Sequence, residues 1–203
     1  MQYMEENPEV SLTFHNLKRS DGKKSIDLNQ FPSLVDKDAY VLDLKETFNT
    51  QVQTLTLVYR NVIKRPEGLN VFNGDALLIA LLAQKGRVAF LNFDGAFYRI
   101  HGGGIHAGNT KYMRILNSIA SRKKMIPFFK HPIKGQLYSK TAYFYKELAK
   151  LDYNNGNYLK CLSNLINMLR YNLLYILSEP KANRYHFLSQ FGKLENQKYT
   201  KNL

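Results

Sequence analysis

Two groups of residues near the middle of this chain have types and spacing that could do chemistry. Asp75 follows Asn73-Gly74 at the predicted start of a helix, where the helix dipole favours an ionised carboxylate. The second group is a glycine-rich loop with two histidines, made up of Arg99, His101, Gly102, Gly103, Gly104 and His106. Together they would suit a reaction in which a base takes a proton while an anionic group leaves.

Asp75 has two possible roles on the residues alone. An ionised carboxylate within hydrogen-bond reach of a hydroxyl can act as the general base that activates it. An aspartate in the first turn of a helix can equally be a capping residue with no role in chemistry. The sequence around Asp75 leaves both roles open.

The glycine loop is a candidate anion site. Arg99, His101 and the amides of Gly102 to Gly104 would give a positively biased loop, and glycine lets the backbone approach a diphosphate closely. His101 could also ligate a divalent metal through a ring nitrogen, with His106 as the weaker candidate. The alternative is a surface loop with no site. A lipase-type oxyanion loop is excluded, because that fold also needs a Gly-x-Ser-x-Gly nucleophile motif, which the chain lacks.

The elements around Asp75 follow from hydrophobic spacing. Leu77, Leu78, Leu81 and Leu82 share one helical face, and Gly86 is expected to end that helix as a C-terminal cap. Two strands should follow, at 88–91 and 96–100. Upstream, we expect the end of a helix before Pro8, a strand over 10–17, an irregular segment with one short helix over 24–48, and a threonine-rich strand over 53–62.

Arg60 lies near the end of that last predicted strand. Its guanidinium could pair either with a buried carboxylate or with a phosphate group of a substrate. From residue 109 onward the spacing is helical, and Asn154-Asn155-Gly156-Asn157 separates two long helices. We predict an αα-hairpin that packs against the rest of the chain or against a partner.

Several segments, taken in order, resemble one enzyme family. GDALLIALLAQKGRVAFL and AFYRIHGGGIHAG are similar to the distal half of bacterial family 2 glycosyltransferases, whose GT-A domain has a Gly-Asp or Glu-Asp pair opening a helix and a Tyr-Arg-x-His tail. TLTLVYRN is similar to the family's Thr-x-x-Phe-Arg-Asn strand, with Tyr59 replacing phenylalanine. The opening MQYMEENPEVSLTFHN resembles the helix and strand that follow the family's metal-binding motif. The resemblance covers residues 1–108.

The resemblance implies an α/β fold: the distal half of a GT-A mixed sheet with flanking helices over 1–108, then a helical extension over 109–203. It implies an inverting transferase that moves a sugar from a nucleotide-diphosphate donor to a glycan or lipid-linked acceptor, in bacterial surface polysaccharide synthesis. Asp75 would be the base, and Arg60, Arg99 and Gly102 to Gly104 would bind substrate. A divalent metal, Mg²⁺ or Mn²⁺, is expected in the complete enzyme, held in part by a half with an Asp-x-Asp motif that would precede residue 1. Alone, the chain should be catalytically incomplete.

Composition limits the other possibilities. The net charge of +13 favours anionic partners, but the basic residues follow no nucleic-acid-binding pattern, so specific nucleic-acid recognition is not expected. The rival hypothesis is a non-enzymatic basic module that binds nucleic acid or anionic membrane through Arg122-Lys123-Lys124 and the C-terminal tail. A further alternative is an inactive gene remnant. With no signal peptide and no long apolar stretch, we expect a cytoplasmic protein, with peripheral attachment to the inner face of the plasma membrane as the alternative.

Overall fold

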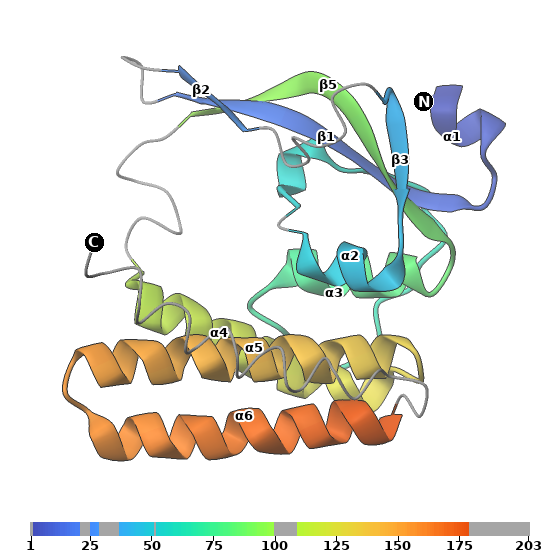
Figure 1. The fold of residues 1–203 in the computed structure, drawn as a ribbon. Coiled ribbons are helices and arrows are strands. Elements are labelled where there is room, and N and C mark those ends of the chain that lie inside the picture. The colour runs from blue at the N-terminus through green and yellow to red at the C-terminus, as the bar shows by residue number, and fades with distance from the viewer. Residues whose placement is uncertain (1, 21–24, 29–36, 51, 100–108, 179–203) are drawn as a thin grey trace. The chain divides into compact units, whose positions relative to one another are not determined.

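The computed structural model describes residues 2–20, 25–28, 37–50, 52–99 and 109–178 (Figure 1). The chain divides into two compact units, Met1–Phe129 and Lys130–Leu203. The first unit is a mixed sheet with flanking helices, and the second contains a helical hairpin. The α/β class expected from the sequence is therefore confirmed at this level.

Strand β1 (Val10–Ser20) is the centre of the sheet. It pairs in parallel with β5 (Arg87–Arg99), and on its other edge antiparallel with β2 (Ser25–Leu28) and β4 (Val58–Tyr59). Strand β3 (Ala39–Leu42) pairs antiparallel with the opposite edge of β5, so the strand order is β2-β1-β5-β3. The first seven residues of β1 are buried apart from His15, as expected for a strand covered on both faces.

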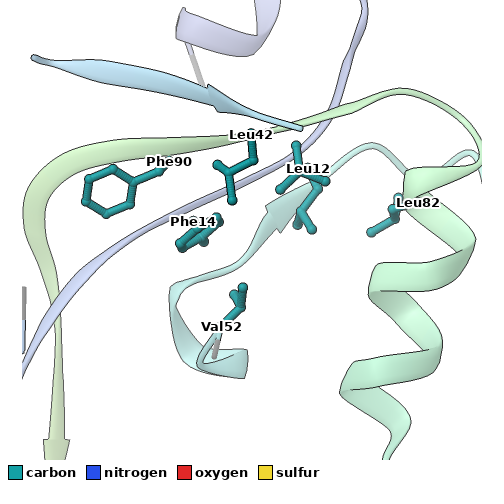
Figure 2. Close-up of a cluster of buried hydrophobic side chains, with 7 residues drawn as sticks. Leu12, Phe14, Leu42, Val52, Leu82 and Phe90 are labelled. Carbon is teal, nitrogen blue, oxygen red and sulfur yellow. The ribbon is translucent and has the colours of Figure 1, made fainter. Parts of the chain in front are cut away.

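The core of this unit lies between the sheet and helix α3 (Gly74–Ala83) (Figure 2). Phe14 of β1 and Phe90 of β5 pack with their ring centroids 5.5 Å apart. The cluster is completed by aliphatic side chains from the surrounding elements: Leu12, Leu42, Val52, Leu82 and Val88. All of these are nearly inaccessible to solvent, so the cluster fixes α3 against the sheet.

The junction after α3 corrects one expectation from the sequence. Gly86 does not have the positive φ of a glycine C-cap. Its role is close approach: a Cβ at residue 86 would lie 2.4 Å from the Glu9 carbonyl oxygen and 3.0 Å from Ser11 Cβ. Ser11 Oγ donates to the Leu82 carbonyl at 2.9 Å, which holds the end of the helix on β1. Glycine is therefore required here for packing and not for its dihedral angles.

Two other predictions are wrong in the same unit. The expected strand over 53–62 is a 3-10 helix, Thr54–Thr56, followed by the two-residue strand β4. Thr56 Oγ1 donates to the Gln53 carbonyl at 2.8 Å, so a threonine hydroxyl stabilises a turn where its β-propensity favoured a strand. The two strands expected at 88–91 and 96–100 are one continuous strand, β5, whose register against β1 shifts around Asn16. The irregularity is a bulge and not a turn.

The remaining helices of this unit agree better with the sequence. Helix α1 (Gln2–Glu6) ends before Pro8 as expected, and α4 (Lys111–Met125) is capped by Thr110. Helix α2 (Leu44–Asn49) is the one short helix expected over 24–48, and it begins with a capping box formed by Asp43 and Glu46. The sequence did not predict β2 or β3 in that segment.

The second unit is the helical hairpin predicted from the sequence. Helix α5 (Ile133–Asn154) and helix α6 (Tyr158–Ser178) are joined by a turn in which Gly156 has φ 74. Across the hairpin, the Tyr171 ring lies 5.6 Å from the Tyr145 ring, centroid to centroid. Asn164 Nδ2 donates to the buried carboxylate of Asp152 at 2.7 Å. No helix among the described residues is long and apolar enough to cross a membrane.

The Gly86 contact gives a stability prediction. Replacing Gly86 with alanine should lower the free energy of unfolding by about 2 kcal/mol, because the new methyl group overlaps main-chain atoms of β1. Gly74→Ala is the matched control, since nothing lies within 4 Å of its Cβ position, and it should be neutral or stabilise by up to about 1 kcal/mol. Urea denaturation measures both. Equal stability of the Gly86→Ala and wild-type chains would show that this contact is not tight.

Candidate functional site at the start of helix α3

Asp75 lies in the first turn of α3, as the sequence predicted. Its Oδ1 accepts a hydrogen bond from the Ala76 amide at 2.8 Å, so the carboxylate satisfies one of the free amides at the helix start. Among the described residues, its Oδ2 has no hydrogen-bond donor. One oxygen therefore caps the helix while the other remains able to accept a proton.

Side chains of helix α4 form hydrogen bonds with the segment that leads into α3. The buried hydroxyl of Ser121 accepts a hydrogen bond from the Asn73 amide at 3.1 Å. Lys124 Nζ donates to the Asn70 carbonyl at 3.3 Å, just before the helix. These two bonds join α4 to the segment that carries Asp75, although the two elements are far apart in the sequence.

Arg122 of α4 carries a positive charge that interacts with the Asp75 carboxylate. Burial lowers the pKa of Arg122 from its usual range to about 10, and the negative charge of Asp75 opposes that shift. The guanidinium is therefore still protonated at neutral pH, and it is attracted to the Asp75 carboxylate. Its Nη1 donates to the Ser118 carbonyl at 3.1 Å, which holds the side chain along the helix.

A buried acceptor without a donor lies at the same helix end. Asn73 is the N-cap residue of α3, yet its side chain makes no capping hydrogen bond. Its Oδ1 is buried and has no hydrogen-bond partner. Buried oxygens in native proteins almost always have a donor, so Asn73 Oδ1 is an exception within the described part of the chain.

Arg60 donates to main-chain carbonyl groups, and not to the buried carboxylate that the sequence suggested as one partner. Its Nε donates to the Val10 carbonyl at 2.9 Å, and one terminal nitrogen donates to the carbonyl of Met4. These bonds tie α1 and the start of β1 to the end of β4. Arg60 thus has a structural role with main-chain partners, and its assignment to substrate binding stays a prediction.

The other residues predicted for the site are not brought to Asp75 by any described contact. Arg99 is exposed at the end of β5. His101, Gly102, Gly103, Gly104 and His106 lie outside the described residues. Within the described part of the chain, no group of three or more His, Cys, Asp or Glu side chains could hold a metal ion. We therefore derive no step through a metal.

A second cluster of side chains, formed by His15 and Phe93, surrounds the bulge in β5. The His15 ring stacks on Phe93 with centroids 4.7 Å apart, and Nδ1 of His15 lies 2.8 Å from the Asn16 carbonyl oxygen. A Cβ at Gly95 would approach both rings to less than 3 Å, so the stack depends on glycine at that position. The signal in the sequence was the interruption of an apolar stretch by Asn92, Asp94 and Gly95.

Comparisons with protein-family models, with curated proteins and with solved structures found no match to this chain. The function is therefore argued from the residues described above.

The pair of Asp75 and Arg122 can be tested by a double-mutant cycle. Asp75→Asn and Arg122→Met should be coupled by about 0.5 to 2 kcal/mol in the free energy of unfolding, because the two opposite charges attract each other and either single change removes that attraction. Lys123→Met supplies the control, since Lys123 is exposed on the same helix. Combined with Asp75→Asn it should be additive within about 0.5 kcal/mol. Equal coupling for both pairs would contradict a specific interaction between residues 75 and 122.

Proposed function

We propose that this chain is the acceptor-side, base-bearing part of an inverting glycosyltransferase of the GT-A type. It would move a sugar from a nucleotide-diphosphate donor to a glycan or lipid-linked acceptor. The observation that carries the proposal is the arrangement at the start of α3. There, the Asp75 carboxylate has one oxygen that caps the helix and one that has no donor among the described residues, and the charge of half-buried Arg122 attracts it.

The chemistry follows from what each group can accept or donate. As the acceptor hydroxyl oxygen attacks the anomeric carbon, Oδ2 of Asp75 takes its proton, and the bond from that carbon to the diphosphate oxygen breaks. The nucleoside diphosphate leaves with the bonding electron pair, and the sugar is joined to the acceptor with inverted configuration.

Arg122 would act as a positioning residue in this reaction. Its guanidinium would attract the Asp75 carboxylate and help to hold it in place. The hydrogen bond from Ala76 to Oδ1 fixes the plane of the carboxylate, so Oδ2 has a defined direction. Both effects come from elements that the fold holds rigidly, which is what a catalytic geometry needs.

Residues other than Asp75, Asn73 and Arg122 would bind the leaving diphosphate. The resemblance assigns Arg99, His101 and the amides of Gly102 to Gly104 to this task, together with a divalent metal held partly by a donor-binding half. These assignments rest on the sequence. The same holds for a role in surface polysaccharide synthesis and for attachment at the inner face of the plasma membrane.

One observation counts against the alternative of a basic binding module. The module hypothesis counts Arg122, Lys123 and Lys124 as adjacent surface cations. Burial lowers the Arg122 pKa, and Lys124 donates to the Asn70 carbonyl, so only Lys123 is without a described contact. A groove for nucleic acid needs several free cations along one face, and this segment supplies fewer than its composition suggests.

The experiment uses the polypeptide that contains both this chain and a donor-binding half, supplied together or as two pieces. Asp75→Asn keeps the side-chain oxygen that caps Ala76 and nearly the same volume, but removes the base. The transfer rate should fall about 10²- to 10⁴-fold while donor affinity is kept.

Asp94→Asn is the matched control, because Asp94 is an exposed carboxylate of the same unit, 3.5 Å from Lys18. It should transfer sugar at the wild-type rate. Melting temperatures of both variants separate loss of folding from loss of the base. Full activity of Asp75→Asn would refute the proposed role of Asp75.

A further inference from the structure

Helix α6 has apolar side chains on two faces, and only one of them has a partner in the hairpin. Met168, Tyr171 and Tyr175 are buried on the first face, where Tyr171 meets aromatic rings of α5. The second face has a row of exposed aliphatic residues: Leu159, Leu162, Ile166, Leu169, Leu173 and Leu177. We call this row the leucine stripe. No residue of the described hairpin covers it.

The exposure of the leucine stripe is large for aliphatic side chains. Leu159 is 87% exposed, Leu177 is 70% exposed, and Leu169, the least exposed of the six, is still 37% exposed. The exposed parts amount to on the order of 600 Å² per copy, at the upper end of the largest apolar patches on typical monomers. Patches of this size mark interaction sites far more often than free surface.

The spacing along the leucine stripe indicates the kind of partner. From Leu159 to Leu173 the steps are three, four, three and four residues, which is the heptad spacing of helices that pack side by side. Leu177 continues the row by one more turn. The stripe is about 27 Å long, so it can lie along another helix over its whole length.

The charges of α6 argue for another protein helix and against a lipid surface. Helices that lie on membranes are rich in Lys and Arg on the face opposite their apolar side. In α6 the face opposite the stripe is packed against α5, and the only charged residues of the helix are Lys160 and Arg170. The six residues of the stripe are uncharged, and the exposed cation Arg170 borders it, four residues after Ile166 and three before Leu173. An apolar partner therefore fits the row itself, with Arg170 at its edge.

We propose that the leucine stripe of α6 is the interface of a dimer with a second copy of this chain. A two-fold axis would place the stripe of one copy against the same stripe of the other, so that the two hairpins form a four-helix bundle. Two such surfaces would bury roughly 1,200 Å² of accessible surface, which reaches the range of stable interfaces. No other segment has to be supplied, because the stripe is complementary to itself.

Sedimentation equilibrium of the full chain tests the proposal. The wild-type chain should be a dimer, with a dissociation constant in the micromolar range or below. Leu162→Glu and Leu173→Glu, at two separate positions of the stripe, should each weaken dimerisation at least 100-fold. Both side chains are more than half exposed, so helicity and melting temperature of the dissociated variants should show a folded hairpin.

Lys160→Glu is the matched control, because Lys160 is exposed on α6 outside the stripe, and it should leave the dissociation constant within about threefold. A wild-type chain that remains monomeric at hundreds of micromolar overturns the proposal, as does a dimer that both Glu variants leave unchanged. A monomer that binds anionic vesicles only when Leu162 and Leu173 are intact would identify the stripe as a membrane surface instead. The readout is independent of sugar transfer, so its failure leaves the enzyme proposal untouched.

Discussion

The first unit depends on the close approach of β1 and the junction between α3 and β5. Parallel neighbours cannot be joined by a tight turn, so the chain must leave β1 and return beside it in the same direction. Gly86 makes the return possible, because a larger residue would overlap the Glu9 carbonyl. The Arg87 amide then donates to that carbonyl at 2.8 Å, and the pairing of β1 with β5 begins there.

This junction also decides where the carboxylate of the candidate site lies. Ser11 holds the C-terminal end of α3 on β1, while Ser121 of α4 holds the segment before its N-terminal end. A helix fixed at both ends presents its first turn in one orientation. Asp75 is therefore held by packing on both sides, and the main-chain bond to Ala76 sets the direction of its open oxygen.

Two opposing effects act on the pKa of Arg122 at the candidate site. Burial disfavours its charge, and Asp75 restores part of the balance. Such an attraction contributes little net stability, but it keeps a half-buried cation within electrostatic reach of the Asp75 carboxylate. That arrangement is more useful to a reaction than to folding.

The helical hairpin is organised on a different principle. Aromatic rings and buried polar groups such as Asp152 and Asn164 specify how α5 and α6 pack. The opposite face of α6 contains only aliphatic side chains in a regular row. The polar groups fix one pairing within the chain, whereas the aliphatic row can fit any surface of the same shape and spacing, including its own copy.

Much of the local structure was determined by the sequence alone. Helices α3, α4 and α6 follow from apolar residues at helical spacing, and the position of Asp75 in a first turn follows from the Asn-Gly pair before that run. The hairpin follows from the asparagine and glycine residues between two long helices. These features depend on neighbours within a few positions, which is the range that a sequence pattern reports.

Only the tertiary structure decided the rest. The hydroxyl of Thr56 turned a segment of high β-propensity into a 3-10 helix, and β2 and β3 exist because longer strands offered them free edges. Gly86 resembled a helix cap, but its function is contact with a strand more than seventy residues away. Arg122 was expected to be a surface cation, yet it is partly buried and its charge interacts with that of Asp75. In each case the deciding partner is distant in sequence, and the free energy of that contact outweighs the local preference.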